Sequence, residues 1–301
     1  MNWMSPELTS WLRGSRTVST RYTHIRIDED PPSRSKGLGE LARLVAKAHS
    51  DAVDHIAALE HETLDPLTSS DTRTLEPRLD YPWGLHTSTL QGYLGEILAG
   101  LIAENFSPHN AKWQVPMFLF RFHNSALEFL EARSQTGAAP HPIPGRSGED
   151  CVAFELGAAN RIVGVMFCEA KCTHSHDSTL IASGHGQLSD SHLRAPADTL
   201  QIIWALKERN DVDAQHWVAA LRTLLYSLST ASPAPRGARP RRRDLFVYVC
   251  GRTRSNGGPW LDPHKCHPRY TARRALAATE VHFDDFDQVL QAVYPKHTIA
   301  R

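Results

Sequence analysis

An acidic residue precedes one short apolar segment of this sequence, and an acid-x-lysine follows the next. Asp150 comes directly before residues 151–156, and Glu169 and Lys171 come directly after residues 161–168. Two carboxylates bind a hard cation such as Mg²⁺ through oxygen, and that cation polarises a phosphate and lowers the pKa of a bound water. A lysine beside them can orient the water and offset charge on the phosphate. These residue types therefore suit the hydrolysis of a phosphodiester.

The two apolar segments predict an antiparallel hairpin. Residues 157–160 between them are turn-forming types in a loop of hairpin length. If Leu156 lies opposite Arg161, counting back along the pair places Asp150 opposite Phe167. The hairpin therefore brings the first acid close to the end of the second strand.

Side-chain alternation then decides which groups share a face. Side chains repeat every two residues along a strand, so Asp150, Glu169 and Lys171 emerge on one face at one end of the hairpin. A slip of one residue would place Glu149 there instead of Asp150. An acid-x-lysine alone is a common exposed pair at strand ends. Here the second strand is apolar on both faces, which indicates a central strand and favours a catalytic role.

A second candidate acidic residue, Glu96, lies upstream in residues 92–104. The apolar residues of this segment recur with the period of an α-helix. Glu96 lies almost opposite the apolar stripe of this helix, next to the small residues Gly95, Ala99 and Gly100. Small residues let another element approach closely, so we expect Glu96 to be packed, and a buried carboxylate needs a partner. A metal ion would supply that partner. The alternative is a glutamate of the first helical turn, stabilised by the helix dipole.

These features resemble the PD-(D/E)XK nuclease superfamily: Gly95 and Glu96 on a helix, an acid before a strand, then residues 167–171. Their order and spacing are similar to the nuclease subunit of Hachiman-type anti-phage systems, the HamA-like group. The resemblance covers about residues 90–190 and extends more weakly toward the C-terminus. No Pro-Asp precedes the first strand, which leaves Asp150 and Glu149 as alternatives for the first metal ligand.

The resemblance implies a metal-dependent DNase with a restriction-endonuclease-like core, often controlled by a helicase-like partner protein. Glu96, Asp150 and Glu169 would hold Mg²⁺ or Mn²⁺, and Lys171 would position the attacking water. Gln187 lies 16 residues after Lys171, where related nucleases often place a polar group on a helix. Gly184 and Gly186 leave a helix uncertain there.

Composition favours a globular protein of the cytoplasm. Of 301 residues, 41% are hydrophobic, and no apolar run approaches the ~20 residues that span a bilayer. The N-terminus lacks the basic and apolar regions of a signal peptide. Five cysteines at irregular spacing argue against a disulfide framework and fit a reducing compartment. The net charge is zero, so nucleic-acid binding would depend on local patches.

One basic patch is visible in residues 231–243, a loop rich in proline and arginine that includes Arg241, Arg242 and Arg243. Clustered arginines can neutralise phosphates and position DNA. The alternative is a solvated linker that happens to contain arginine.

Histidine and cysteine offer a competing metal site. Cys168, Cys172, His174 and His176 look like half of a zinc cluster, and residues 264–267 could supply the other half. Neither half has a C-x2-C spacing, and alternation points Cys168 away from Glu169. No P-loop and no G-x-S-x-G elbow occur, which argues against an NTPase and a serine hydrolase.

The sequence predicts an α/β fold with a central mixed sheet flanked by helices. We expect strands at 151–156, 161–169 and 244–250, a helical N-terminal part at 1–85 and a nuclease-like domain at 86–301, possibly as one continuous domain. Residues 37–62 predict a long amphipathic helix, a candidate partner surface. Residues 197–209 and 212–229 predict a packed helix pair with Leu200, Ile203 and Trp204 in the contact.

The predicted function is a Mg²⁺-dependent DNA nuclease, an anti-phage effector controlled by a helicase-like partner. One alternative is a catalytically silent, nuclease-like binding subunit. The other is a zinc-stabilised interaction module.

Overall fold

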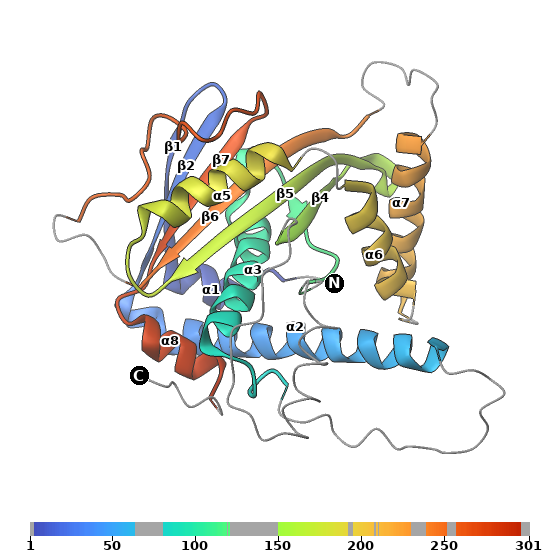
Figure 1. Ribbon diagram of the computed structural model, residues 1–301, viewed down its shortest axis with the longest axis horizontal. Helices are drawn as coiled ribbons and strands as arrows, with labels where there is room; N and C mark the ends of the chain where they lie inside the picture. Colours follow the sequence, from blue (N-terminus) through green and yellow to red (C-terminus); the bar gives the residue numbers. More distant parts are fainter. Residues whose placement is uncertain are drawn as a thin grey trace.

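The fold is built around one mixed β-sheet with helices on both faces (Figure 1). The computed structural model describes residues 3–63, 81–118, 120, 150–191, 195–207, 209, 211–229, 239–251 and 257–295, without the side chains of 53–63, 195–198 and 228–229. In these residues the strand order is β1-β2-β7-β6-β5-β4-β3. The strands are β1 (Leu12–Val18), β2 (Tyr22–Glu29), β3 (Trp113–Gln114), β4 (Cys151–Leu156), β5 (Ile162–Thr173), β6 (Arg241–Cys250) and β7 (Leu276–His282).

The four central strands are parallel, and the outer pairings are antiparallel. β5 pairs with β6, β6 with β7, and β7 with β2, all in parallel. β4 pairs with β5, β3 with β4, and β1 with β2 in the antiparallel sense. The carboxyl ends of β5, β6, β7 and β2 therefore meet at one edge of the sheet, the kind of edge where open α/β folds place their ligands.

Two groups of helices cover the two faces. The helices α1 (Pro6–Trp11), α2 (Arg34–Thr63), α3 (Thr87–Phe106) and α8 (Phe286–Val293) share one core with the sheet, whereas α5 (Ser178–Asp190), α6 (Ala195–Lys207) and α7 (Val212–Ser229) share the other. Along β5, Met166 and Cys168 face the first group, and Val165 and Phe167 face the second. β5 is thus a central strand buried on both faces, as its sequence predicts.

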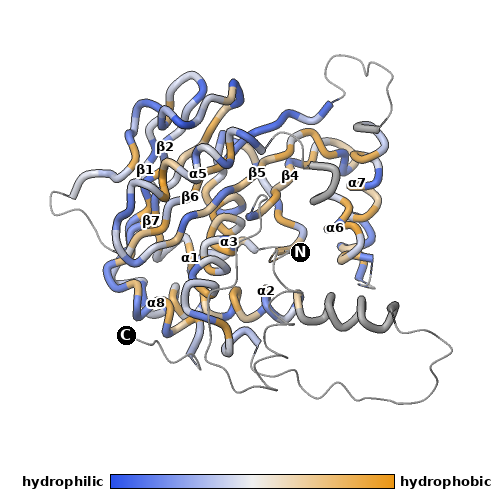
Figure 2. Tube along the Cα trace, viewed as in Figure 1, coloured by the Kyte–Doolittle hydropathy of each residue, from blue (hydrophilic) through white to orange (hydrophobic). Residues whose placement is uncertain are grey.

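Hydropathy follows this architecture. Figure 2 shows hydrophobic residues concentrated along α3 and the central strands, with a mixed pattern along α2. Leu41, Leu44 and Val45 of α2 are buried in the core. The long helix predicted at 37–62 is confirmed, but the apolar side of its first half packs inside the molecule. These residues are not a free surface for a partner.

Close packing explains the small residues of α3. A Cβ atom at Gly100 would lie 2.4 Å from the ring of Phe118, and one at Gly95 would lie 3.1 Å from Cβ of Cys172. The helix at 92–104 is confirmed, and it is longer than predicted. Because α3 begins at Thr87, Glu96 lies in its middle, so the first-turn interpretation of this residue is wrong.

The N-terminal part differs from the prediction. Residues 12–29 form β1 and β2, and β2 pairs with β7 inside the common sheet. A helical N-terminal part at 1–85 is therefore only partly correct. The missed strands have polar residues buried on the sheet face, including Thr23 and His24, which hides the apolar alternation.

Two further expectations need correction. The helices α6 and α7 are present, but Leu200 is 38% exposed and Trp204 is 53% exposed, so neither lies in the predicted contact. Ile203 is buried as predicted, and Ile202 and Leu206 are buried in place of the other two. The part of the chain that the structure describes has no helix long and apolar enough to cross a membrane.

Candidate active site

The register of β4 and β5 places Asp150 beside Glu169. Cys151 pairs with Cys168, so the preceding residue, Asp150, extends the ladder next to Glu169. The predicted partner of Asp150 was Phe167, two residues earlier. The predicted antiparallel pairing of the two strands is confirmed, but the predicted register is wrong by two residues.

Two separate shifts produce that difference. Leu156 pairs with Ile162, because the turn has one residue more than predicted, and Ala159 and Asn160 adopt left-handed backbone angles there. The ladder then shifts once more between Leu156 and Glu155, which pairs with Gly164. Either shift alone would move Asp150 to the other face. Together they preserve the face.

β5 is also longer than predicted, since it runs to Thr173. Glu169 and Lys171 therefore lie within the strand rather than after it. Ala170 and Cys172 pack toward α3, so alternation turns Glu169 and Lys171 toward α5. The sheet and α5 together form the walls of the site.

Lys171 lies between two acceptors. Its Nζ atom donates to Oε1 of Glu169 at 2.7 Å and to Oε1 of Gln187 at 2.7 Å. The Glu169 side chain is only 5% exposed, whereas that of Lys171 is 20% exposed. The lysine therefore joins a nearly buried carboxylate to the solvent side of the site.

The helix α5 supplies Gln187, at a position where the sequence leaves a helix uncertain. Asp177 caps the helix, and its Oδ1 accepts from the backbone N–H of Thr179 at 2.7 Å. A Cβ atom at Gly184 would lie 2.4 Å from the ring of Phe246 and 3.2 Å from Cγ of Lys171. This glycine lets α5 approach the sheet closely, which brings Gln187 to the lysine.

Asp150 is fixed at the entrance to β4. Its backbone N–H donates to the carbonyl of Cys168 at 2.9 Å, and its Oδ2 accepts from the backbone N–H of Ala170 at 2.6 Å. The backbone of the neighbouring strand thus holds this carboxylate next to Glu169. Glu149, the alternative ligand, lies outside the described residues.

Glu96 lies on α3, the helix that covers the opposite face of the sheet. It is 5% exposed, as its small neighbours predict. Burial raises the pKa of Tyr81, Tyr93 and Tyr294, and the charge of Glu96 adds to the rise in each. The structure thus places Glu96 among these tyrosines, while direct contacts join Lys171, Glu169 and Gln187.

Two carboxylates, Asp150 and Glu169, share the candidate site. In the described part of the chain, no three His, Cys, Asp or Glu side chains are arranged to hold a metal ion. A three-carboxylate set of Glu96, Asp150 and Glu169 is therefore not assembled in this structure. The two that share a face remain the candidate oxygen ligands.

The residues of the zinc hypothesis have separate surroundings. Cys168 is fully buried in the core toward α3. His174 lies 3.4 Å from Asp287, and His176 stacks on Trp260 with a centroid distance of 3.9 Å. The candidate zinc ligands therefore each contact a different part of the protein.

The predicted arginine loop is partly a strand. Arg241, Arg242 and Arg243 begin β6 and pair with residues 164–166, whereas Lys171 pairs with Tyr248. The arginines are thus at the far end of β6, about 20 Å from Lys171 at ~3.3 Å per residue. The earlier residues of the loop, 231–238, lie outside the described part.

Internal contacts hold two of these arginines. Arg241 makes an ion pair with Glu155 at 3.2 Å, although its side chain is 63% exposed. Arg242 donates to the hydroxyl of Ser191 at 2.6 Å and lies over the ring of Phe167 at 4.3 Å. Arg242 therefore stabilises the fold, and Arg241 is the more accessible of the two.

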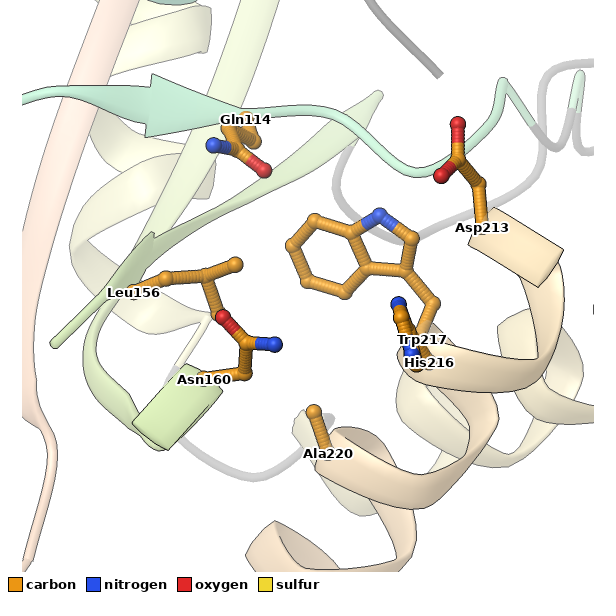
Figure 3. Close-up of a pocket in the computed structure, with 7 residues that line it drawn as sticks. All are labelled: Gln114, Leu156, Asn160, Asp213, His216, Trp217 and Ala220. Atoms are coloured by element: carbon orange, nitrogen blue, oxygen red, sulfur yellow. The ribbon is translucent and has the colours of Figure 1, made fainter. Parts of the chain in front are cut away.

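A pocket of about 240 Å³ lies at the other end of the hairpin (Figure 3). Gln114, Asn160 and Asp213 surround the indole of Trp217, with Leu156 beside it. Because Leu156 is the last residue of β4 and Asp150 precedes the first, this pocket is separate from the carboxylates.

Several polar residues on the same sheet face as Lys171 could not be recognised from the sequence. Tyr248, Glu280 and His24 are buried there. Glu280 and His24 lie on β7 and β2, which were not expected. Tyr248 lies on the expected strand β6, but an isolated polar residue within an apolar segment gave no signal.

Neither the protein-family models nor the curated proteins compared with this sequence contain a match to it.

Proposed function

We propose that this protein is a Mg²⁺-dependent DNA nuclease whose site is formed by Asp150, Glu169 and Lys171. The observation that carries the proposal is the arrangement of these three residues at one end of a central hairpin. Asp150 enters β4 beside Glu169, and Lys171 donates to Glu169 at 2.7 Å. This is the arrangement that suggested the PD-(D/E)XK resemblance in the sequence.

The donor set fits a magnesium ion. Proteins bind Mg²⁺ through one or two carboxylates, together with waters and substrate phosphates, so Asp150 and Glu169 are sufficient in number and type. When bound, the ion supplies Lewis-acid polarisation of the phosphate and lowers the pKa of water. The cluster needs no third carboxylate for this role, so the proposal does not depend on Glu96.

Lys171 would act on the water and on the phosphate. Its ammonium group is held by Glu169 and Gln187 and is partly exposed, so its third hydrogen can point toward solvent. There it would orient a water molecule and offset negative charge that develops on the phosphate. Because both acceptors are fixed to the fold, this position is set before substrate binds.

We further propose that a helicase-like partner controls this nuclease as part of an anti-phage system. The resemblance to Hachiman-type nuclease subunits supports this role. A net charge of zero also gives little electrostatic attraction to DNA, so a partner would deliver the substrate. Co-purification with the products of neighbouring genes tests this part, and a chain that binds none of them and degrades plasmid rapidly by itself would contradict it.

One observation favours a silent binding subunit as the second candidate. The Glu169 side chain is almost buried and already paired with Lys171, as in a purely structural ion pair. Plasmid cleavage separates the two functions. A nuclease will convert supercoiled plasmid in Mg²⁺ and stop in EDTA, whereas a silent subunit will leave the plasmid intact in both.

A further inference from the structure

A row of polar side chains extends the candidate site across the sheet. Lys171 on β5 is in register with Tyr248 on β6, which is in register with Glu280 on β7. Residues in register on parallel strands share a face, and neighbouring strands lie about 4.8 Å apart. Glu280 is therefore about 10 Å from Lys171, on the same face.

Glu280 is a fully buried carboxylate that anchors a loop. Its Oε2 accepts from the backbone N–H of Trp260 at 2.5 Å and from that of Leu261 at 3.0 Å. His24 lies 3.2 Å from its Oε1, and His282 lies 3.6 Å from its Oε2. Burial alone would raise the pKa of Glu280, but the nearby rings of His24 and His282 and the backbone N–H of Leu261 outweigh burial and lower it to about 2.

Other contacts fix the same segment, residues 257–262, which we call the strap. The hydroxyl of Tyr22 donates to the carbonyl of Asp262 at 2.7 Å, and Arg26 donates to the carbonyl of Gly257. Both donors lie on β2. The strap is thus tied to two strands of the sheet, which makes it a rigid support.

Trp260 of the strap stacks on His176 of the segment between β5 and α5. The ring centroids are 3.9 Å apart, and the planes differ by 12°. Nδ1 of His176 lies 3.1 Å from the hydroxyl of Tyr248, the neighbour of Lys171. Both stacked side chains are partly exposed. A pre-ordered aromatic pair therefore borders the candidate site.

We propose that His176 and Trp260 form a stacking platform for a nucleobase of single-stranded DNA whose phosphate occupies the candidate site. This inference rests on the proposed function for the identity of its ligand. Unpaired bases expose their faces, and stacking on aromatic side chains tolerates any sequence. His176 contacts Tyr248, the neighbour of Lys171 in the sheet, so the platform would hold a base close to the phosphate that is cut.

The charge of the chain supports this assignment. With no net charge, the protein has little long-range attraction to phosphates. Stacking supplies affinity that does not depend on counterion release, and so it changes little with salt. The platform therefore predicts a component of binding that ionic strength does not remove.

The test compares two labelled single-stranded probes of equal length, oligothymidylate and an abasic oligonucleotide, by fluorescence anisotropy in EDTA. Trp260→Ala is expected to weaken oligothymidylate binding at least fivefold, as the loss of one stacked base would. The slope of affinity against salt should stay unchanged, and abasic binding should change less than twofold. His176→Ala should act in the same direction.

Two variants make this test specific. Trp260→Phe keeps an aromatic face and should bind within about threefold of wild type, which excludes a collapsed strap as the cause. Trp204→Ala removes a half-exposed tryptophan of α6 and should have no effect. Equal losses in Trp260→Ala and Trp204→Ala, equal losses for both probes, or no wild-type binding would overturn the platform.

The outcome also separates the platform from the nuclease proposal. Cleavage that persists with no role for Trp260 in binding would refute the platform and leave the nuclease. Binding that depends on Trp260 in a protein that never cuts DNA would refute the nuclease and leave the platform.

Discussion

Lys171 donates from Nζ to Oε1 of Glu169 at 2.7 Å, and the two residues lie on the same face of β5 with one residue between them. Alternation along the strand makes this contact possible, and the close approach of α5 completes it with Gln187 at 2.7 Å from the same Nζ. The position of the lysine therefore depends on packing between a helix and the sheet. That packing can be changed without touching the charged residues.

Gly184→Ala should destabilise the protein by about 1–3 kcal/mol and lower cleavage, because the new methyl group meets the buried ring of Phe246. Pushing α5 outward also moves Gln187 away from Lys171. Gly186→Ala is the matched control, since a Cβ atom there meets nothing within 4 Å. It should stabilise the helix by up to about 1 kcal/mol. Urea unfolding of both variants checks this pair, and equal effects would show that α5 does not approach the sheet as described.

Asp150→Asn should reduce cleavage far more than Glu149→Gln, because the ladder places Asp150 beside Glu169. The loss for Asp150→Asn should be on the order of 10²-fold or more, as expected for a metal ligand. Initial cleavage rates in Mg²⁺ measure both variants. The reverse ranking would mean that the face assignment of β4 is wrong.

Because the His49 ring is buried, the protein should lose stability in mild acid. Burial lowers the pKa of His49 to about 3, and its ring nitrogens face the hydroxyls of Tyr81 and Tyr294. In the unfolded chain the pKa is 6.5, so below that pH the unfolded state takes up a proton that the folded state excludes. The stabilisation is complete above pH 6.5 and is lost progressively as the pH falls toward 3.

Between pH 6.5 and 4.5 this effect should reach about 2 kcal/mol of unfolding free energy. His49→Phe removes the titrating group, so its stability should depend less steeply on pH over the same range. Urea unfolding at several pH values compares the two proteins. Parallel pH profiles would show that His49 is not held neutral in the folded state.

The sequence predicted the elements whose local pattern is unambiguous. The apolar stripe of α3 and the two apolar segments of β4 and β5 identify helix and hairpin, and these place Asp150, Glu169 and Lys171 on one face. The register could not be derived, because the left-handed turn at Ala159 and the irregularity at Leu156 depend on tertiary packing.

Other elements were missed for a different physical reason. β2 and β7 bury His24 and Glu280, so their alternation does not look apolar. The helix α5 contains Gly184, a residue that disfavours helices locally but is needed for close contact with Phe246. In both cases long-range contacts override the local preference, and a single sequence carries no record of them.

The central claim is that Glu169 and Lys171 act in metal-dependent cleavage of DNA. The most direct measurement is the rate of plasmid cleavage in Mg²⁺ by wild type, Glu169→Ala and Lys171→Ala, with Glu40→Ala as a control that removes another ion-paired glutamate. The account predicts that wild type and Glu40→Ala cut at similar rates, that EDTA stops both, and that the two site variants lose about 10³-fold or more while remaining folded. Cleavage by both site variants at the wild-type rate, or none by wild type, would contradict it.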